Sequence, residues 1–193
     1  MGNDFTTALR PAIVMTILFA LLLGLAYPLA LTGIGQAVFP GAANGSLVRD
    51  GDTVVGSTVI GQAFTSDRYF HSRPSAAGKG YDGLASSGSN LGPASQALSD
   101  RVKADVATES ASAPGKAVPA DLVTASASGL DPDISPEAAL FQVGRVAKAR
   151  HLAEAQVRVL VEKSIDRPLL GDEHVNLFLL NRQLDRLGAT PAP

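Results

Sequence analysis

The chain has 193 residues, no cysteine and no tryptophan, and its formal net charge is −2. That length suits one compact domain with additional segments. The absence of cysteine excludes disulfides and thiolate metal sites, and the scattered, nearly balanced charge gives no electrostatic footprint for nucleic acid.

An uncharged apolar run lies near the N-terminus. No charged residue occurs between Arg10 and Arg49, and residues 11–31 provide the roughly 20 apolar residues that a helix needs to cross about 30 Å of hydrocarbon. A cleaved signal peptide with its site at residues 24–26 is the alternative, but the apolar stretch continues past that site to Val38. We therefore predict a retained transmembrane helix over residues 11–31.

The basic residues predict the orientation of this helix. Arg10 and the α-amino group precede the span, and the next basic residue, Arg49, lies well beyond it. The positive-inside rule then places residues 1–10 in the cytoplasm as a short tail. The chain from about residue 35 onward is expected outside.

The remaining chain is expected to form one extramembrane domain. Residues 32–46 are rich in glycine and alanine and predict an uncharged stalk. We assign residues 47–187 to the domain and residues 188–193 to a C-terminal tail. The predicted fold class is an α+β (or α/β) extramembrane domain with one N-terminal transmembrane helix.

Hydrophobic periodicity predicts the elements of this domain. A β-hairpin is expected over residues 47–61, around the turn signal Asp50-Gly51. Residues 62–92 are rich in aromatic side chains without helical periodicity, and we expect an ordered loop that packs on the domain. The further elements are a helix from 93 or 94 to about 108, a mobile linker at 109–118, helices at 135–151 and 154–164, a buried strand at 174–180, and a final amphipathic helical segment at 181–187.

Residues 122–137 read LVTASASGLDPDISPE, and we considered them as a cation site. A calcium loop that starts at Asp131 would place Pro136 where glycine is needed and Gln142 where a bidentate glutamate is needed, so this kind of site is rejected. Ser135, Pro136 and the acid that follows are instead typical of a helix start. The small hydroxyl residues of 124–131 have no such local explanation.

Motifs for catalysis are weak. The chain has no Gly-x-Ser-x-Gly sequence, and each of its three histidines, at positions 71, 151 and 174, has an ordinary explanation. Residues 87–93 could bind an anion at a helix N-terminus or form a tight turn around Ser89 and Asn90. Gln142 and Arg145 share one side of the 135–151 helix, as a solvated edge or a polar contact surface. The opposite side, Ala139, Val143, Val146 and Ala147, is the predicted core face.

The order of the unusual segments is itself a pattern. Ser-Asn-Leu-Gly-Pro at 89–93 and Thr-Ala-Ser-Ala-Ser-Gly-Leu-Asp-Pro at 124–132 are highly specific blocks. Together with the aromatic segment at 61–76 and Gln-Val-Gly-Arg-Val-Ala at 142–147, they resemble the C subunits (KdpC) of Kdp potassium-transporting ATPases. The resemblance extends from the N-terminal anchor to about residue 181. Ser95-Gln96 and Arg150-His151 depart from the usual pattern, at the ends of elements.

The resemblance implies a non-pumping accessory subunit of a bacterial inner-membrane complex. Its partners would be a channel-like potassium-binding subunit and the P-type ATPase catalytic subunit, which carry potassium translocation and ATP hydrolysis. Family members are needed for assembly, have their outer domain over the potassium entrance, and are assigned a role in raising ATP affinity. No catalytic site, metal or tightly bound cofactor is expected, and no nucleic acid. Direct ATP contact conflicts with an external domain, because the bilayer separates the two.

We expect partner or ligand contacts from residues of the aromatic loop, the hydroxyl-rich stretch and the 135–151 helix. A membrane-tethered envelope hydrolase and a free-standing ligand-binding module are the alternatives. The candidate contact residues are Gln62, Phe64, Tyr69, Phe70, Arg73, Tyr81, Ser89, Asn90, Thr124, Ser126, Ser128, Asp131, Gln142 and Arg145.

Overall fold

The computed structural model describes residues 2–189, so residues 190–193 of the predicted C-terminal tail lie outside the described residues. The chain divides into two compact units, Met1–Leu47 and Val48–Pro193, and each is described by itself. The second unit mixes helices with two small sheets, which confirms the predicted α+β class.

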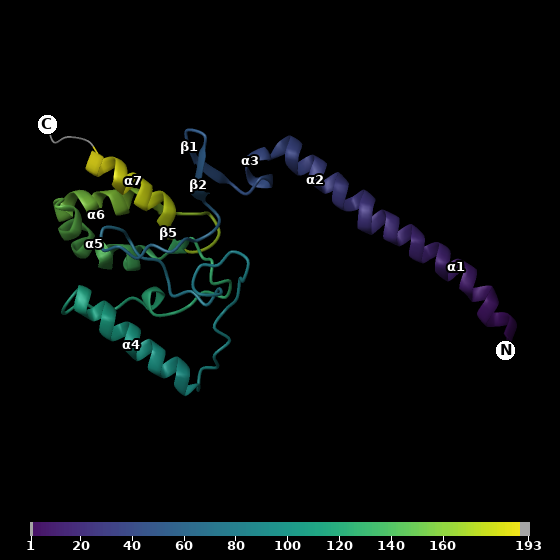
Figure 1. Ribbon diagram of the computed structural model, residues 1–193, viewed down its shortest axis with the longest axis horizontal. Helices are drawn as coiled ribbons and strands as arrows, with labels where there is room; N and C mark the ends of the chain where they lie inside the picture. Colours follow the sequence, from purple (N-terminus) through teal and green to yellow (C-terminus); the bar gives the residue numbers. More distant parts are fainter. Residues whose placement is uncertain (1, 190–193) are drawn as a thin grey trace. The chain divides into compact units, whose positions relative to one another are not determined.

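The first unit is a long apolar helix (Figure 1). It comprises α1 (Gly2–Leu21), a π-helical turn (Leu22–Ala26) and α2 (Tyr27–Val38), and the short α3 (Pro40–Ala43) follows. Thr6–Val38 contains an 18-residue window with a mean hydropathy of 2.3 and is long and apolar enough to cross a membrane. The helix therefore includes residues 32–38 of the predicted stalk.

Pro28 accounts for the π-helical turn. A proline inside a helix cannot donate a hydrogen bond, and its ring clashes with the carbonyl four residues earlier. The chain inserts one wider turn directly before it, in which the backbone N–H of Tyr27 donates to the carbonyl of Leu22. Such an insertion relieves the clash without ending the helix.

The domain begins with a two-stranded sheet of β1 (Leu47–Asp50) and β2 (Thr53–Ser57). Gly51 in the turn has a φ of 57°, a left-handed value that glycine adopts without strain. The predicted hairpin is confirmed, although its second strand ends at Ser57. Residues 58–95 contain no helix or strand, yet Phe70 and Ala77 are completely buried, which confirms an ordered loop packed on the domain.

A three-stranded sheet and three helices form the core. β3 (Asp133–Ile134), β5 (His174–Asn176) and β4 (Ile165–Asp166) are ordered β3-β5-β4, and both pairs are antiparallel. α5 (Pro136–Arg150), α6 (Glu154–Lys163) and α7 (Leu177–Ala189) pack with this sheet. The predicted core face of α5 is confirmed, because its four residues are at most 1% exposed.

The predicted strand at 174–180 is wrong beyond residue 176. The Asn176 side chain accepts a hydrogen bond from the backbone N–H of Leu179 at 3.2 Å, which is the geometry of a helix N-cap. Leu177, Leu180 and Leu184 then share one buried face of α7. The apolar run is the start of a helix because its buried positions follow helical spacing.

α4 (Gln96–Ser112) differs from the other helices of the domain. It contains no buried residue, and in Figure 1 it lies apart from α5, α6 and α7. Its last turn includes Glu109, so the predicted linker at 109–118 begins only after Ser112. A short 3-10 helix (Ala120–Leu122) leads from this connection back to the core.

Candidate functional site

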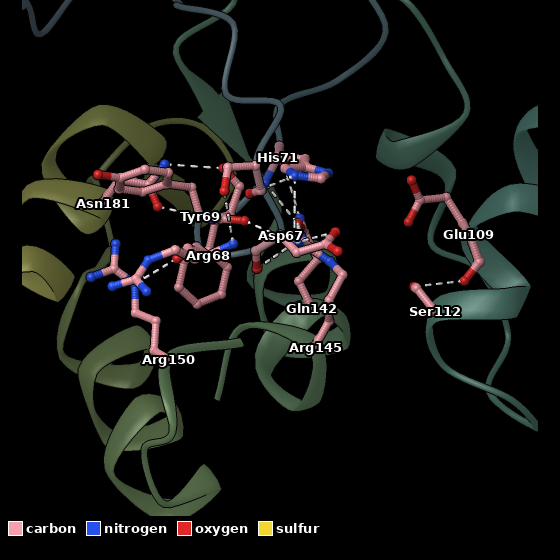
Figure 2. A network of polar contacts seen from close by, with 12 residues as sticks. Asp67, Arg68, Tyr69, His71, Glu109, Ser112, Gln142, Arg145, Arg150 and Asn181 are labelled. Carbon is pink, nitrogen blue, oxygen red and sulfur yellow. Dashed lines mark hydrogen bonds and ion pairs between the residues drawn. The ribbon is translucent and has the colours of Figure 1, made fainter. Parts of the chain in front are cut away.

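Two consecutive residues of the long loop are each held by a buried amide side chain (Figure 2). The carbonyl oxygen of Asn181, from α7, accepts from the backbone N–H of Phe70 at 2.9 Å, and its amide nitrogen donates to the Phe70 carbonyl at 3.0 Å. Gln142, from α5, makes the same pair with His71 at 2.7 and 3.1 Å. We call residues 66–73, fixed in this way, the clamped loop.

Two arginines bind the backbone carbonyl groups of Asp67, Arg68 and Tyr69 in the clamped loop. Arg145 donates from Nη1 to the carbonyls of Asp67 and Tyr69 at 2.9 and 3.0 Å, and from Nη2 to Gln142 Oε1 at 2.7 Å. Arg150 donates to the carbonyl of Arg68 at 2.6 Å. Its guanidinium also lies 4.7 Å from the centre of the Tyr69 ring, within cation–π range. Planar guanidinium groups suit such multiple contacts.

Burial dominates the electrostatics of this region. It lowers the pKa of Arg145, while Asp67 and Glu109 act to raise it. Burial and then Arg145 lower the pKa of His71, so the neutral imidazole is favoured. Burial also raises the pKa of Glu109, on the last turn of α4. His71 and the neighbouring Arg145 and Glu109 are therefore partly desolvated.

The hydroxyl-rich stretch 124–131 contacts the last residue of the clamped loop and the segment that follows it. Arg73 pairs with Asp131 at 2.9 Å and donates to the carbonyl of Thr124 at 3.3 Å. Ser75 donates to the carbonyl of Gly129 at 2.6 Å, and the Tyr81 hydroxyl donates to the carbonyl of Arg73 at 2.8 Å. These contacts give the stretch an internal structural role, which its sequence left unexplained.

Gly129 is required by this arrangement. Its φ is 66°, and an added Cβ would lie 2.7 Å from the backbone N of Ala77 and 2.6 Å from the carbonyl oxygen of Ser87. No real Cβ approaches backbone so closely, so only glycine fits here. The segments 75–88 and 126–130 therefore lie directly against each other.

The predicted helix start is confirmed. The Ser135 hydroxyl accepts from the backbone N–H of Ala138 at 3.2 Å, and Pro136 and Glu137 occupy the first turn. The backbone N–H of Ser135 donates to Asp121 Oδ2 at 2.7 Å. At the other end, His151 is the left-handed cap with a φ of 58°.

The structure gives two candidate contact residues an internal role instead. Phe70 is completely buried and Gln142 is 1% exposed, so neither has surface with which to touch a partner. Gln142 is thus neither a solvated edge nor a polar contact surface. Buried amides of this kind are tolerated because every polar atom is paired.

The other candidates keep some exposed surface but fall into separate groups. Gln62 and Phe64 precede the clamped loop, and the rings of Phe64 and Tyr69 are 5.4 Å apart. Ser126 and Ser128 accept hydrogen bonds from backbone N–H groups of residues 129 and 130. Their contact with a partner or ligand stays a prediction.

Ser89 and Asn90 do not lie at a helix N-terminus. α4 starts at Gln96, and Asn90 has a φ of 53°, a left-handed value that asparagine tolerates in turns. The helix-terminal anion site is therefore wrong, and the tight turn around Ser89 and Asn90 stays a prediction, because none of the backbone hydrogen bonds of residues 2–189 closes a turn there.

Sequence reasoning missed Asn181, Arg150 and Asp185. Asp185 accepts from Arg150 at 2.7 Å and from the Tyr69 hydroxyl at 3.3 Å. The signal was available in the spacing, because helical periodicity from Leu177 places Asn181 on the buried face with Leu180 and Leu184. It was hidden by the interpretation of 174–180 as a strand.

A cavity of about 540 Å³ lies between α4 and the loop. Its lining combines basic, acidic and aromatic side chains, including Arg73, Lys79, Asp105, Glu109, Phe64 and Tyr81. Within residues 2–189, no group of three or more histidine, aspartate or glutamate side chains is placed to hold a metal ion. The His71 ring contacts the carbonyl of Ser66 and the guanidinium of Arg145, and the His174 ring contacts the carbonyl of Asp172.

These observations define a class: a protein with one candidate membrane-spanning helix and an α+β domain built around a buried, side-chain-clamped loop. The family model described as KdpC, the K+-transporting ATPase c chain, matches residues 9–186. The chain therefore belongs to the KdpC family of potassium-transporting ATPase subunits.

Several curated relatives are similar over nearly the whole chain. A potassium-transporting ATPase KdpC subunit of Caulobacter vibrioides is 58% identical over 181 residues, which cover 92% of both chains. The KdpC subunit of Allorhizobium ampelinum is 58% identical, covering 94% of this chain and 97% of its own. That of Methylobacterium nodulans is 54% identical, with 93% and 96% covered.

Proposed function

We propose that this chain is the non-pumping accessory subunit of a high-affinity, ATP-driven potassium uptake complex, and that the complex needs it for assembly. The observation that carries the proposal is the family match over residues 9–186, which includes both the apolar helix and the domain. ATP hydrolysis and potassium translocation belong, in this proposal, to the partner subunits. ATP and potassium are handled by the complex, and this chain holds no cofactor of its own.

The proposed partners are a channel-like potassium-binding subunit and a P-type ATPase catalytic subunit. The helix offers small residues for close approach to neighbouring membrane helices, among them Ala20, Gly24 and Ala26. Helices associate in lipid largely through such close packing. An added Cβ at Gly24 would meet nothing within 4 Å, which leaves this position open to a neighbour.

The proposed location is the bacterial inner membrane, with the N-terminus in the cytoplasm and the domain outside over the potassium entrance. The support is Arg10 before the span and the absence of basic residues from there to Arg49. An effect on ATP affinity would then pass through the partner subunits as a coupling free energy, since ATP lies across about 30 Å of hydrocarbon.

The absence of native cysteine makes the orientation directly testable. Single-cysteine variants Ala8→Cys and Ala117→Cys place one exposed thiol before the predicted span of residues 11–31 and one beyond it. In intact cells permeable only at the outer membrane, a membrane-impermeant maleimide should label residue 117 and not residue 8. Labelling of residue 8 alone would overturn the proposed orientation.

Deletion of the gene tests the assembly role. Without the chain, growth on micromolar potassium should stop, and the two partner subunits should no longer co-purify from mild detergent. Complementation with the full chain should restore both. Normal uptake by cells that lack the chain would contradict the proposal.

A further inference from the structure

The connection between β4 and β5 carries two of the most exposed apolar side chains of the domain. Leu169 and Leu170 are 100% and 88% exposed, and they lie next to each other in residues 167–173. Leaving a leucine in water rather than burying it costs about 1.5–3 kcal/mol. Folding of the domain does not account for the pair, because neither side chain reaches the core.

Contacts within the loop fix its conformation. Asp166 pairs with His174 at the end of the β4–β5 ladder, and Arg167 Nε donates to Glu173 Oε1 at 2.9 Å across the base. Pro168 fixes its own φ, and Gly171 has a φ of 105°, a value suited to glycine. The two leucines are thus presented at a braced tip, which lowers the entropy cost of binding.

The charged side chains around the tip indicate whether it binds a lipid surface or a protein surface. Asp166, Asp172 and Glu173 provide three carboxylates, and Arg167 provides one guanidinium, so these four side chains, which we call the acidic collar, carry a net negative charge. A bilayer with anionic lipids repels such a collar, since its surface potential is negative. A protein socket with a basic rim attracts it. The collar therefore favours a protein surface over a lipid surface.

The small apolar area of the tip indicates that the chain needs a second attachment to bind the partner stably. Burying two leucines contributes about 3–6 kcal/mol, which is too little for stable association from dilute solution once orientational freedom is lost. The contact becomes sufficient when a second attachment raises the effective concentration. The apolar helix of the same chain provides that attachment for a partner in the same membrane.

We propose that residues 167–173 form a docking loop whose Leu169–Leu170 tip fills an apolar, basic-rimmed socket on a membrane-embedded partner subunit. The inference rests on the proposed function and adds to it the place and the chemistry of one contact. Arg167 and Glu173 keep the loop in shape, and the acidic collar orients it on the rim.

Single-cysteine labelling in the assembled complex tests this proposal. Leu169→Cys should react with a water-soluble maleimide at least about tenfold more slowly in the complex than in the isolated chain in detergent, because a buried site must open before it reacts. Leu84→Cys is the matched control, since Leu84 is also 100% exposed but lies on another loop. Its labelling rate should not change.

The double variant Leu169→Asp/Leu170→Asp tests whether the loop helps to hold the chain in the complex. The isolated variant should unfold as wild type does, because both side chains are exposed, yet it should be retained in the complex at least about tenfold more weakly. The double variant Leu169→Met/Leu170→Met should be retained in the complex as strongly as wild type, since methionine is apolar and similar in volume to leucine.

The outcomes separate the possibilities. A complex that co-purifies intact while Leu169→Cys is labelled at the rate of the isolated chain overturns the docking loop and leaves the proposed function standing. Failure to co-purify with any potassium-transport subunit overturns both. Protection in anionic liposomes without partners, protection that rises with the concentration of this chain alone, or equal slowing at Leu84→Cys also overturns the proposal.

Discussion

The side chain of Gln142 pairs with the backbone of His71 as a neighbouring β-strand would, accepting from its N–H and donating to its carbonyl. Asn181 does the same for Phe70, the preceding residue. The clamped loop thus obtains from two helices the backbone hydrogen bonds that it does not obtain from a sheet. Buried backbone groups need such partners, and for this reason an irregular segment can be ordered.

Replacement of Gln142 by leucine should destabilise the domain strongly. Gln142→Leu keeps the volume but leaves the His71 N–H and carbonyl without the amide, and an unpaired buried polar group costs about 1–3 kcal/mol. We expect a loss of about 2–4 kcal/mol in the free energy of unfolding, measured by denaturant titration of the chain in detergent with circular dichroism. Gln156→Leu, on the exposed side of α6, should change it by less than about 0.5 kcal/mol. Equal losses would contradict the clamp.

The two amide clamps should be energetically coupled. Asn181→Leu alone is expected to cost about as much as Gln142→Leu, because each removes one pair of hydrogen bonds from adjacent residues. Once one clamp is lost the loop loosens, so the double variant should fall short of the sum by about 0.5–3 kcal/mol. A double-mutant cycle by denaturant titration measures this difference. Strict additivity would mean that the loop does not act as one unit.

Gly129 should tolerate alanine much less well than Gly51. Both have a φ near 60°, namely 66° and 57°, so both variants bear the left-handed cost of about 1–2 kcal/mol. Only at Gly129 does the new Cβ meet backbone atoms, whereas nothing lies within 4 Å at Gly51. Gly129→Ala should therefore lose more than about 3 kcal/mol. Similar unfolding midpoints for the two variants would contradict the close packing of 126–130 on 75–88.

α4 should contribute little to the stability of the domain. Val106 on α4 is 38% exposed, whereas Val146 on α5 is completely buried. Val146→Ala should cost about 2 kcal/mol through lost burial and a residual cavity, and Val106→Ala less than about 0.5 kcal/mol. Hydrogen exchange followed by mass spectrometry should show amides of 96–112 exchanging before those of 136–150. A shared exchange rate would show that α4 unfolds with the core.

Two histidines should affect the pH dependence of stability with opposite signs. Burial lowers the pKa of His71 below 6.5, so the unfolded state binds its proton more readily and stability falls as pH falls through that window. The hydrogen bond to the carbonyl of Asp172 raises the pKa of His174. Its contribution is complete below 6.5 and is lost as pH rises through the raised pKa.

Unfolding measured at about pH 5.5 and about pH 8, below and above the ordinary histidine pKa of about 6.5, separates the two effects. On acidification, His71→Gln should lose less stability than wild type, and His174→Gln should lose more. Variants that follow the wild-type pH dependence would show that neither ring titrates differently in the folded state.

Much of the fold could be predicted because it depends on local patterns. The apolar run, the hairpin turn at Gly51 and the Ser135-Pro136 helix start each depend on residues close in sequence. The boundary errors arose where the local pattern fits two conformations. The run after His174 is apolar in either conformation, and only the cap by Asn176 and the packing of Leu180 make it a helix.

The family, the apolar helix and the unusual segments follow from the amino-acid sequence alone, because specific blocks of residues and hydrophobic length are visible without coordinates. The internal roles of those segments emerge from the folded domain. Gln142 and Arg145 looked like a polar surface, yet they bind a backbone more than 70 positions earlier. Arg73 likewise meets Asp131 across 58 positions. Pairing over such separations is set by how helices and loops pack, and no local spacing carries that information.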